Sequence, residues 1–94
     1  MGVKEHRFPN QVGADKAWGR LEPELGNLSK QYGLDLEKVG TTSVTLKRTG
    51  ADVLATITEN EVVVRVDLSW FVPKTIEQKI EAELNSRIPP LLKA

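Results

Sequence analysis

The single histidine, His6, is the residue best suited to acid–base or nucleophilic chemistry in this 94-residue chain. A serine–histidine–aspartate arrangement would need one of the chain's four serines beside it. None of these serines has the glycines of a nucleophile elbow around it: Ser29, Ser43, Ser69 and Ser86. We therefore interpret His6 as a histidine of the surface or of a strand edge.

Two carboxylates, Asp35 and Glu37, are two positions apart and would share one face of a strand. Paired carboxylates serve acid–base catalysis or metal binding, but the solvated face of a strand often carries such a pair. An enzyme would need His6 close to one of them. Glycine-rich phosphate loops and cysteine–histidine metal spacings are absent from the sequence. We expect a non-enzymatic protein without a cofactor or a metal.

The most apolar short stretch of the chain, Trp70-Phe71-Val72, is the best candidate for a binding surface. Aromatic residues between a strand and a helix commonly pack under that helix, which is one interpretation of this stretch. Three consecutive large apolar side chains cannot all point one way, however. The alternative is that part of the stretch stays exposed and, together with Leu91 and Leu92, forms an apolar patch for self-association or adsorption.

Composition excludes several partners. Thirteen basic and thirteen acidic residues leave no net charge, and Lys47-Arg48 is too short a basic patch, so we expect no nucleic-acid binding. Cysteine is absent, which is compatible with a reducing compartment. No apolar run approaches the roughly 20 residues of a membrane span, and the N-terminus lacks the apolar core of a signal peptide. We expect one cytoplasmic domain over residues 1–94.

Three strands in succession, 43–48, 51–58 and 61–68, are the clearest structural signal. Apolar residues occupy every second position, so that one face of each strand is apolar and the other is polar. Two-residue turns at Thr49-Gly50 and at Glu59-Asn60 would bring apolar residues opposite one another. The expected pairs are Leu46 with Val53, Val44 with Ala55, Ile57 with Val62, Ala55 with Val64, and Val53 with Val66. A further strand is expected over 34–39, with Leu34 and Leu36 inward, and a short one over 3–8, which Pro9 ends.

Two helices complete the prediction. Between Gly13 and Gly33, apolar residues recur at helical spacing: Ala14, Trp18, Leu21, Leu25, Leu28 and Tyr32. Pro23 should kink or divide this helix unless burial of its apolar stripe prevails. The second helix is expected from about Pro73 or Thr75 to Arg87, with a capping box of Thr75 and Gln78. Its apolar stripe is Ile76, Ile80, Leu84 and Ile88, its exposed ion pairs are Lys79 with Glu83 and Glu83 with Arg87, and Pro89-Pro90 should end it. The fold class is therefore α+β: an antiparallel meander sheet of four or five strands, with both helices on one face, in the order β-α-β-β-β-β-α.

Nearly the whole chain resembles the polyhydroxyalkanoic acid system family, small bacterial proteins named for genes found near polyester-granule genes. The likeness lies in an ordered set of segments: Pro9 to Gly13, a helix ending in Tyr32-Gly33-Leu34, the turn Lys47 to Gly50, the strand Glu59 to Leu68, an apolar loop with a proline, and the helix Ile76 to Leu84. The family usually has histidine, serine and leucine before the glycine of the first segment. This chain has Asn10, Gln11 and Val12 there.

The resemblance implies a non-enzymatic protein of polyhydroxyalkanoate storage, with the granule surface or granule proteins as partners. It brings no catalytic residues. An apolar patch beside an amphipathic helix would adsorb to polyester as such helices adsorb to lipid. The alternative is a small homodimeric scaffold or partner-binding module that uses a sheet edge.

Overall fold

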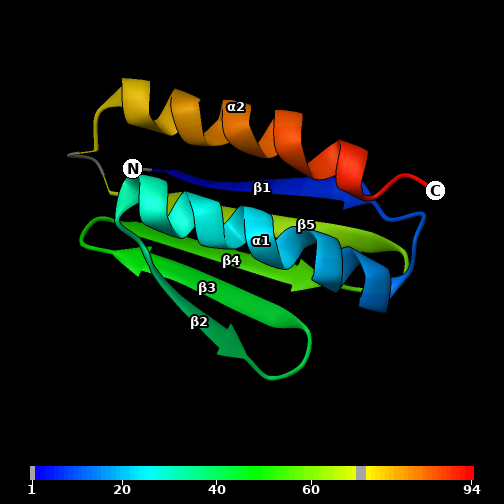
Figure 1. Ribbon diagram of the computed structural model, residues 1–94. Coiled ribbons are helices and arrows are strands. Elements are labelled where there is room, and N and C mark those ends of the chain that lie inside the picture. Colours follow the sequence, from blue (N-terminus) through cyan, green and yellow to red (C-terminus); the bar gives the residue numbers. More distant parts are fainter. Residues whose placement is uncertain (1, 70–71) are drawn as a thin grey trace.

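Five strands and two helices follow one another in the computed structural model, which describes residues 2–69 and 72–94. Both helices lie on the same face of the sheet (Figure 1). The elements are β1 (Gly2–Pro9), α1 (Ala14–Tyr32), β2 (Asp35–Val39), β3 (Ser43–Arg48), β4 (Ala51–Ile57), β5 (Glu61–Leu68) and α2 (Lys74–Leu91). This order confirms the predicted α+β fold.

The strands form one antiparallel sheet in the order β1-β5-β4-β3-β2. All five apolar pairs expected from the two turns are present, from Leu46 opposite Val53 to Ile57 opposite Val62. Alternation fixes this register because a shift by one residue would turn the apolar side chains into solvent. The first strand ends at Pro9, as predicted, and pairs with β5.

The strand β2 corrects one expectation. Leu36 is opposite Leu46 and so belongs to the helix-covered face, as predicted, but 37% of its surface remains exposed. The alternation of the sequence predicts on which face of the sheet a side chain lies, whereas burial also requires a helix that covers that part of the face. This strand lies at the edge of the sheet, and all five of its residues are exposed. Leu34, just before the strand, is buried.

The helix α1 runs without a break from Ala14 to Tyr32, through Pro23. Burial of Ala17, Leu21, Leu25 and Leu28 holds its inner face, while Pro23 lies on the exposed side, where water can bind the carbonyl that it leaves unpaired. Gly33 ends the helix in the left-handed conformation, as its position predicted.

The start of α1 depends on a residue from another turn. Gly13 precedes the helix with a φ of 84° and has no side chain for capping. The Glu59 carboxylate from the β4–β5 turn accepts a hydrogen bond from the backbone N–H of Ala14 at 3.1 Å. A carboxylate at a helix N-terminus satisfies a free N–H and complements the helix dipole.

The helix α2 extends further than predicted, because it continues through Pro89 and Pro90 to Leu91. Proline has a backbone angle that suits a helix, and here it costs only hydrogen bonds to the carbonyls of two exposed residues, Asn85 and Ser86. Burial of Ile88 and Leu92 holds this last turn on the sheet. The predicted capping box is wrong: Pro73 occupies the N-cap position, and no side chain caps the helix.

The ion pairs of α2 follow the prediction in one of two cases. Glu83 pairs with Arg87, as expected, and Arg87 also binds Glu24 of α1 at 3.1 Å. A Lys79–Glu83 pair is not among the ion pairs formed by residues 2–69 and 72–94. The charged contact to Glu24 therefore ties the two helices together, and Lys79 is left for other interactions.

Candidate functional site: an apolar hollow between the helices

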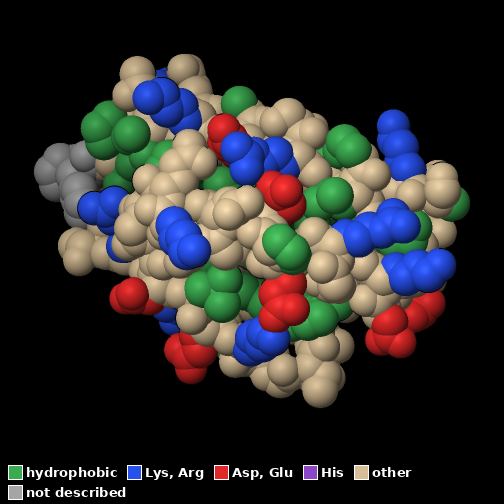
Figure 2. All heavy atoms as spheres, in the orientation of Figure 1, with side chains coloured by type: hydrophobic (Ala, Val, Ile, Leu, Met, Phe, Trp, Pro, Cys, Tyr) green, Lys and Arg blue, Asp and Glu red, His purple; other side chains and the backbone are tan. Residues whose placement is uncertain are grey.

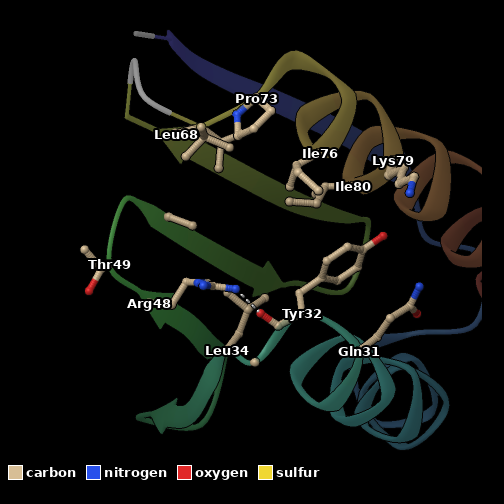
Figure 3. A pocket seen from close by; sticks show the side chains of 13 residues that line it. Gln31, Tyr32, Leu34, Arg48, Thr49, Leu68, Pro73, Ile76, Lys79 and Ile80 are labelled. Atoms are coloured by element: carbon tan, nitrogen blue, oxygen red, sulfur yellow. Dashed lines mark hydrogen bonds between the residues drawn. The ribbon is translucent and has the colours of Figure 1, made fainter.

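A hollow of about 750 Å³ opens where the C-terminal end of α1 and the N-terminal end of α2 meet one end of the sheet (Figure 3). It is built from the ends of several elements: Tyr32 at the end of α1, Leu34 just after it, Arg48 at the end of β3, Leu68 at the end of β5, and Ile76 in the first turn of α2. Its volume is in the range of small-molecule sites in proteins.

The floor of the hollow is apolar. Four residues that are almost fully buried form the base of the cavity: Leu34, Ala51, Leu68 and Ile80. Val72 and Ile76 are half-buried at its side. Partly covered apolar side chains around a concave surface are typical of a binding site for an apolar group.

The walls carry positive charge and no carboxylate. Arg48 and Lys79 line the hollow from β3 and from α2, and none of its described lining residues is acidic. Arg48 donates a hydrogen bond of 2.6 Å to the backbone carbonyl of Tyr32. That carbonyl is uncharged, and no carboxylate among the described residues pairs with Arg48, so its positive charge is not neutralised at the end of α1, where a cation also complements the helix dipole.

The Tyr32 side chain supplies a hydrogen-bond donor. Figure 3 shows its hydroxyl pointing from α1 toward α2. Burial raises the pKa of Tyr32 above its ordinary value of 10.0, and the charge of Glu83 adds to this shift while that of Arg87 opposes it. The phenol is therefore protonated at neutral pH and can donate a hydrogen bond at the edge of the hollow.

The three described residues of the predicted binding patch, Val72, Leu91 and Leu92, do not lie together. Val72 lines the hollow, and Trp70 and Phe71, which precede it, lie outside the described residues. Leu91 is at the other end of α2, about 27 Å away at 1.5 Å per helical residue. Leu92 is only 1% exposed, which corrects the expectation that it joins an exposed patch.

The structure separates the candidate catalytic residues. His6 is in β1 and Asp35 and Glu37 are in β2, which are the two opposite edges of the sheet. Four strand spacings of about 4.8 Å place them about 19 Å apart. The histidine and carboxylates that an enzyme was expected to bring together are therefore not in one site.

The surroundings of His6 are nevertheless charged, which was not predicted from the sequence. The residue lies under α2, with its Nε2 atom 3.9 Å from a carboxylate oxygen of Glu81. Lys4, on the same face of β1, contacts Glu81 at 2.9 Å and Glu77 at 3.1 Å. Hydrogen bonds to Glu81 and then Glu77 raise the pKa of Lys4. These carboxylates are four positions apart on one helix face, and that spacing was the available signal.

Charges of both signs are mixed over the surface in view (Figure 2). Across the described ranges 2–69 and 72–94, no cluster of three histidine, cysteine or acidic residues could hold a metal ion. Neither of the two helices found in those ranges is long and apolar enough to cross a membrane. The hollow is therefore the candidate binding site among the described residues.

Comparisons with known proteins found no matching family model, no similar curated protein and no similar solved structure.

Proposed function

We propose that this protein is a non-enzymatic component of polyhydroxyalkanoate storage that adsorbs to the polyester granule through the end of the molecule where the hollow opens. The observation that carries the proposal is the hollow itself, whose apolar lining includes the half-buried Val72 and Ile76. The family resemblance of the sequence is the reason for choosing polyester as the partner.

The chemistry of the partner fits the hollow. The polyester exposes apolar alkyl side chains and ester groups that are polar but uncharged. Each CH₂ group of such a chain that leaves water contributes about 0.8 kcal/mol. A few alkyl groups seated over Leu68, Val72 and Ile76 would therefore hold the protein at the surface reversibly.

Sedimentation with washed polyester granules tests this proposal. Wild-type protein is expected in the pellet, and both the double variant Trp70→Ser/Phe71→Ser and the single variant Ile76→Asn in the supernatant. Leu91→Ser is the matched control, since it makes a half-buried leucine polar at the far end of α2. Circular dichroism verifies that each variant is folded. Equal sedimentation of wild type and of the folded Ile76→Asn variant would exclude the hollow as the contact.

A homodimer joined through the edge of β1 is the second candidate function. Two-fold antiparallel pairing of β1 about His6 would set Glu5 of each copy opposite Arg7 of the other, which is favourable. The edge strand β2 is less suited, because each two-fold register that pairs three or more of its residues sets like charges opposite, such as Glu37 against Glu37.

Light scattering over a dilution series distinguishes the two candidates. A β1 dimer should dissociate on dilution, weaken in Arg7→Glu, and recover in the double variant Glu5→Arg/Arg7→Glu. A constant monomer mass at every concentration would rule the dimer out and leave the granule proposal standing.

A further inference from the structure

The charge of the hollow specifies its ligand more narrowly than its apolar floor does. Its two ionisable side chains with a full charge at neutral pH, Arg48 and Lys79, are both cationic. Lys79 has no ion pair to the described acidic residues, and it is exposed on the first half of α2. Glu83 is close enough to influence Tyr32, but its carboxylate is paired with Arg87.

We infer that the hollow binds a single-chain alkyl carboxylate, with the carboxylate held between the Lys79 ammonium and the Tyr32 hydroxyl and the alkyl chain lying over Ile76 and Ile80 toward Leu68. Charge complementarity selects this ligand, since the lining provides cations and a hydroxyl donor at the rim and apolar atoms below. A neutral lipid would leave the cations unpaired, and a cationic amphiphile would be repelled.

The inference shares with the proposed function only the use of the same hollow. A free fatty acid and the carboxyl end of a polyester chain both present a carboxylate on an alkyl chain, so either could be the source of the ligand. A soluble alkyl carboxylate is a probe of the hollow without the polymer. Binding of free acid together with failure to sediment granules would identify a fatty-acid site and refute granule adsorption. Sedimentation without acid binding would refute the present inference alone.

Titration of the full chain with sodium octanoate, sodium decanoate and decanol, followed by calorimetry and by amide chemical shifts, tests the inference. Decanoate should bind about tenfold more tightly than octanoate, because two additional CH₂ groups each contribute up to about fourfold. Decanol should bind about fivefold to tenfold more weakly than decanoate. The shifted amides should cluster around Tyr32, Val72 and Ile76.

Charge variants locate the head group. Lys79→Glu should weaken decanoate binding about tenfold while leaving decanol binding unchanged. Lys16→Glu is the matched control, because Lys16 is an exposed lysine near the N-terminal end of α1, away from the hollow. This variant should bind decanoate and decanol with the same affinity as the wild type. Absence of decanoate binding, equal binding to Lys79→Glu and wild type, or shifts spread over the whole surface would each overturn the inference.

Discussion

Replacing Asn10 with alanine should destabilise the protein far more than its place in a loop suggests. Asn10 is the only buried polar residue found among the described residues, at 8% exposure. Its side-chain amide donates to the carbonyl of Thr58 at 2.8 Å, and its side-chain oxygen accepts from the N–H of Val12 at 3.1 Å. One side chain thus connects the end of β1, the β4–β5 turn and the approach to α1.

The expected loss of unfolding free energy follows from these two hydrogen bonds. Each contributes about 1 kcal/mol net, and a buried group that loses its partner costs about 1 kcal/mol more. Thr58 is exposed, so that water can replace the lost donor at its carbonyl, but the N–H of half-buried Val12 has less access to water. We expect Asn10→Ala to lower the free energy of unfolding by about 2 to 3 kcal/mol.

Urea unfolding followed by circular dichroism measures this loss. With a slope of about 1 kcal/mol/M for a small domain, the midpoint should fall by about 2 to 3 M while the slope stays constant. Asn85→Ala is the control, since Asn85 is exposed in α2 and alanine favours a helix. A loss below about 1 kcal/mol in Asn10→Ala, or equal effects of both variants, would show that the two hydrogen bonds do not stabilise this junction.

Two further predictions concern conformation and ionisation. Gly26→Ala should stabilise the protein by about 0.5 to 1 kcal/mol, since nothing lies within 4 Å of the carbon atom that it adds in α1. Gly13→Ala should destabilise the protein, because Gly13 has a positive φ and the added carbon would lie 3.3 Å from the Glu59 carboxylate. Equal thermal midpoints of the two variants would contradict this. Tyr32 is the single tyrosine, so absorbance at 295 nm reports its ionisation. The native protein should titrate above pH 10.0 and the urea-unfolded protein near it. Because the folded pKa is raised, the stability that Tyr32 contributes is complete below pH 10.0 and is lost as the pH rises through the folded pKa, and Tyr32→Phe should lessen that loss. A native midpoint at or below 10.0 would contradict the burial of the phenol.

The strand register could be predicted because it depends on local alternation and on two short turns. Val53 and Val66, for instance, can be paired from the sequence once the Glu59-Asn60 turn is assigned. How far each side chain is buried could not be predicted, because burial depends on where a helix from another part of the chain lies. Leu36 follows the pattern of a core residue and is exposed at an edge strand for that reason.

The end of α2 shows the opposite case, in which a local rule is overruled. Pro89 and Pro90 are strong breakers by local criteria, but Ile88 and Leu92 have apolar positions to fill on the sheet. The grouping of Leu91 and Leu92 with Val72 went wrong for a related reason, since the continuous helix α2 places both leucines at the far end from Val72.

The hollow itself had no signal in the sequence. Tyr32, Arg48 and Lys79 are far apart in the chain and come together because α1, β3 and α2 all have one end at the same end of the sheet. The pairing of β1, which α2 contacts through Lys4, with β5 is equally non-local. Only Gly33 after Tyr32 and the Thr49-Gly50 turn after Arg48 indicated that these residues end their elements.

Hydrogen–deuterium exchange of the protein bound to polyester granules shows directly whether the hollow is the contact surface. Exchange should slow in the first turns of α2, around Ile76, and around Leu34, with no change at the far end of α2 or along the exposed edge of β2. Protection confined to β1, or to the Leu91 end of α2, would contradict the claim that the hollow between the helices is the binding surface.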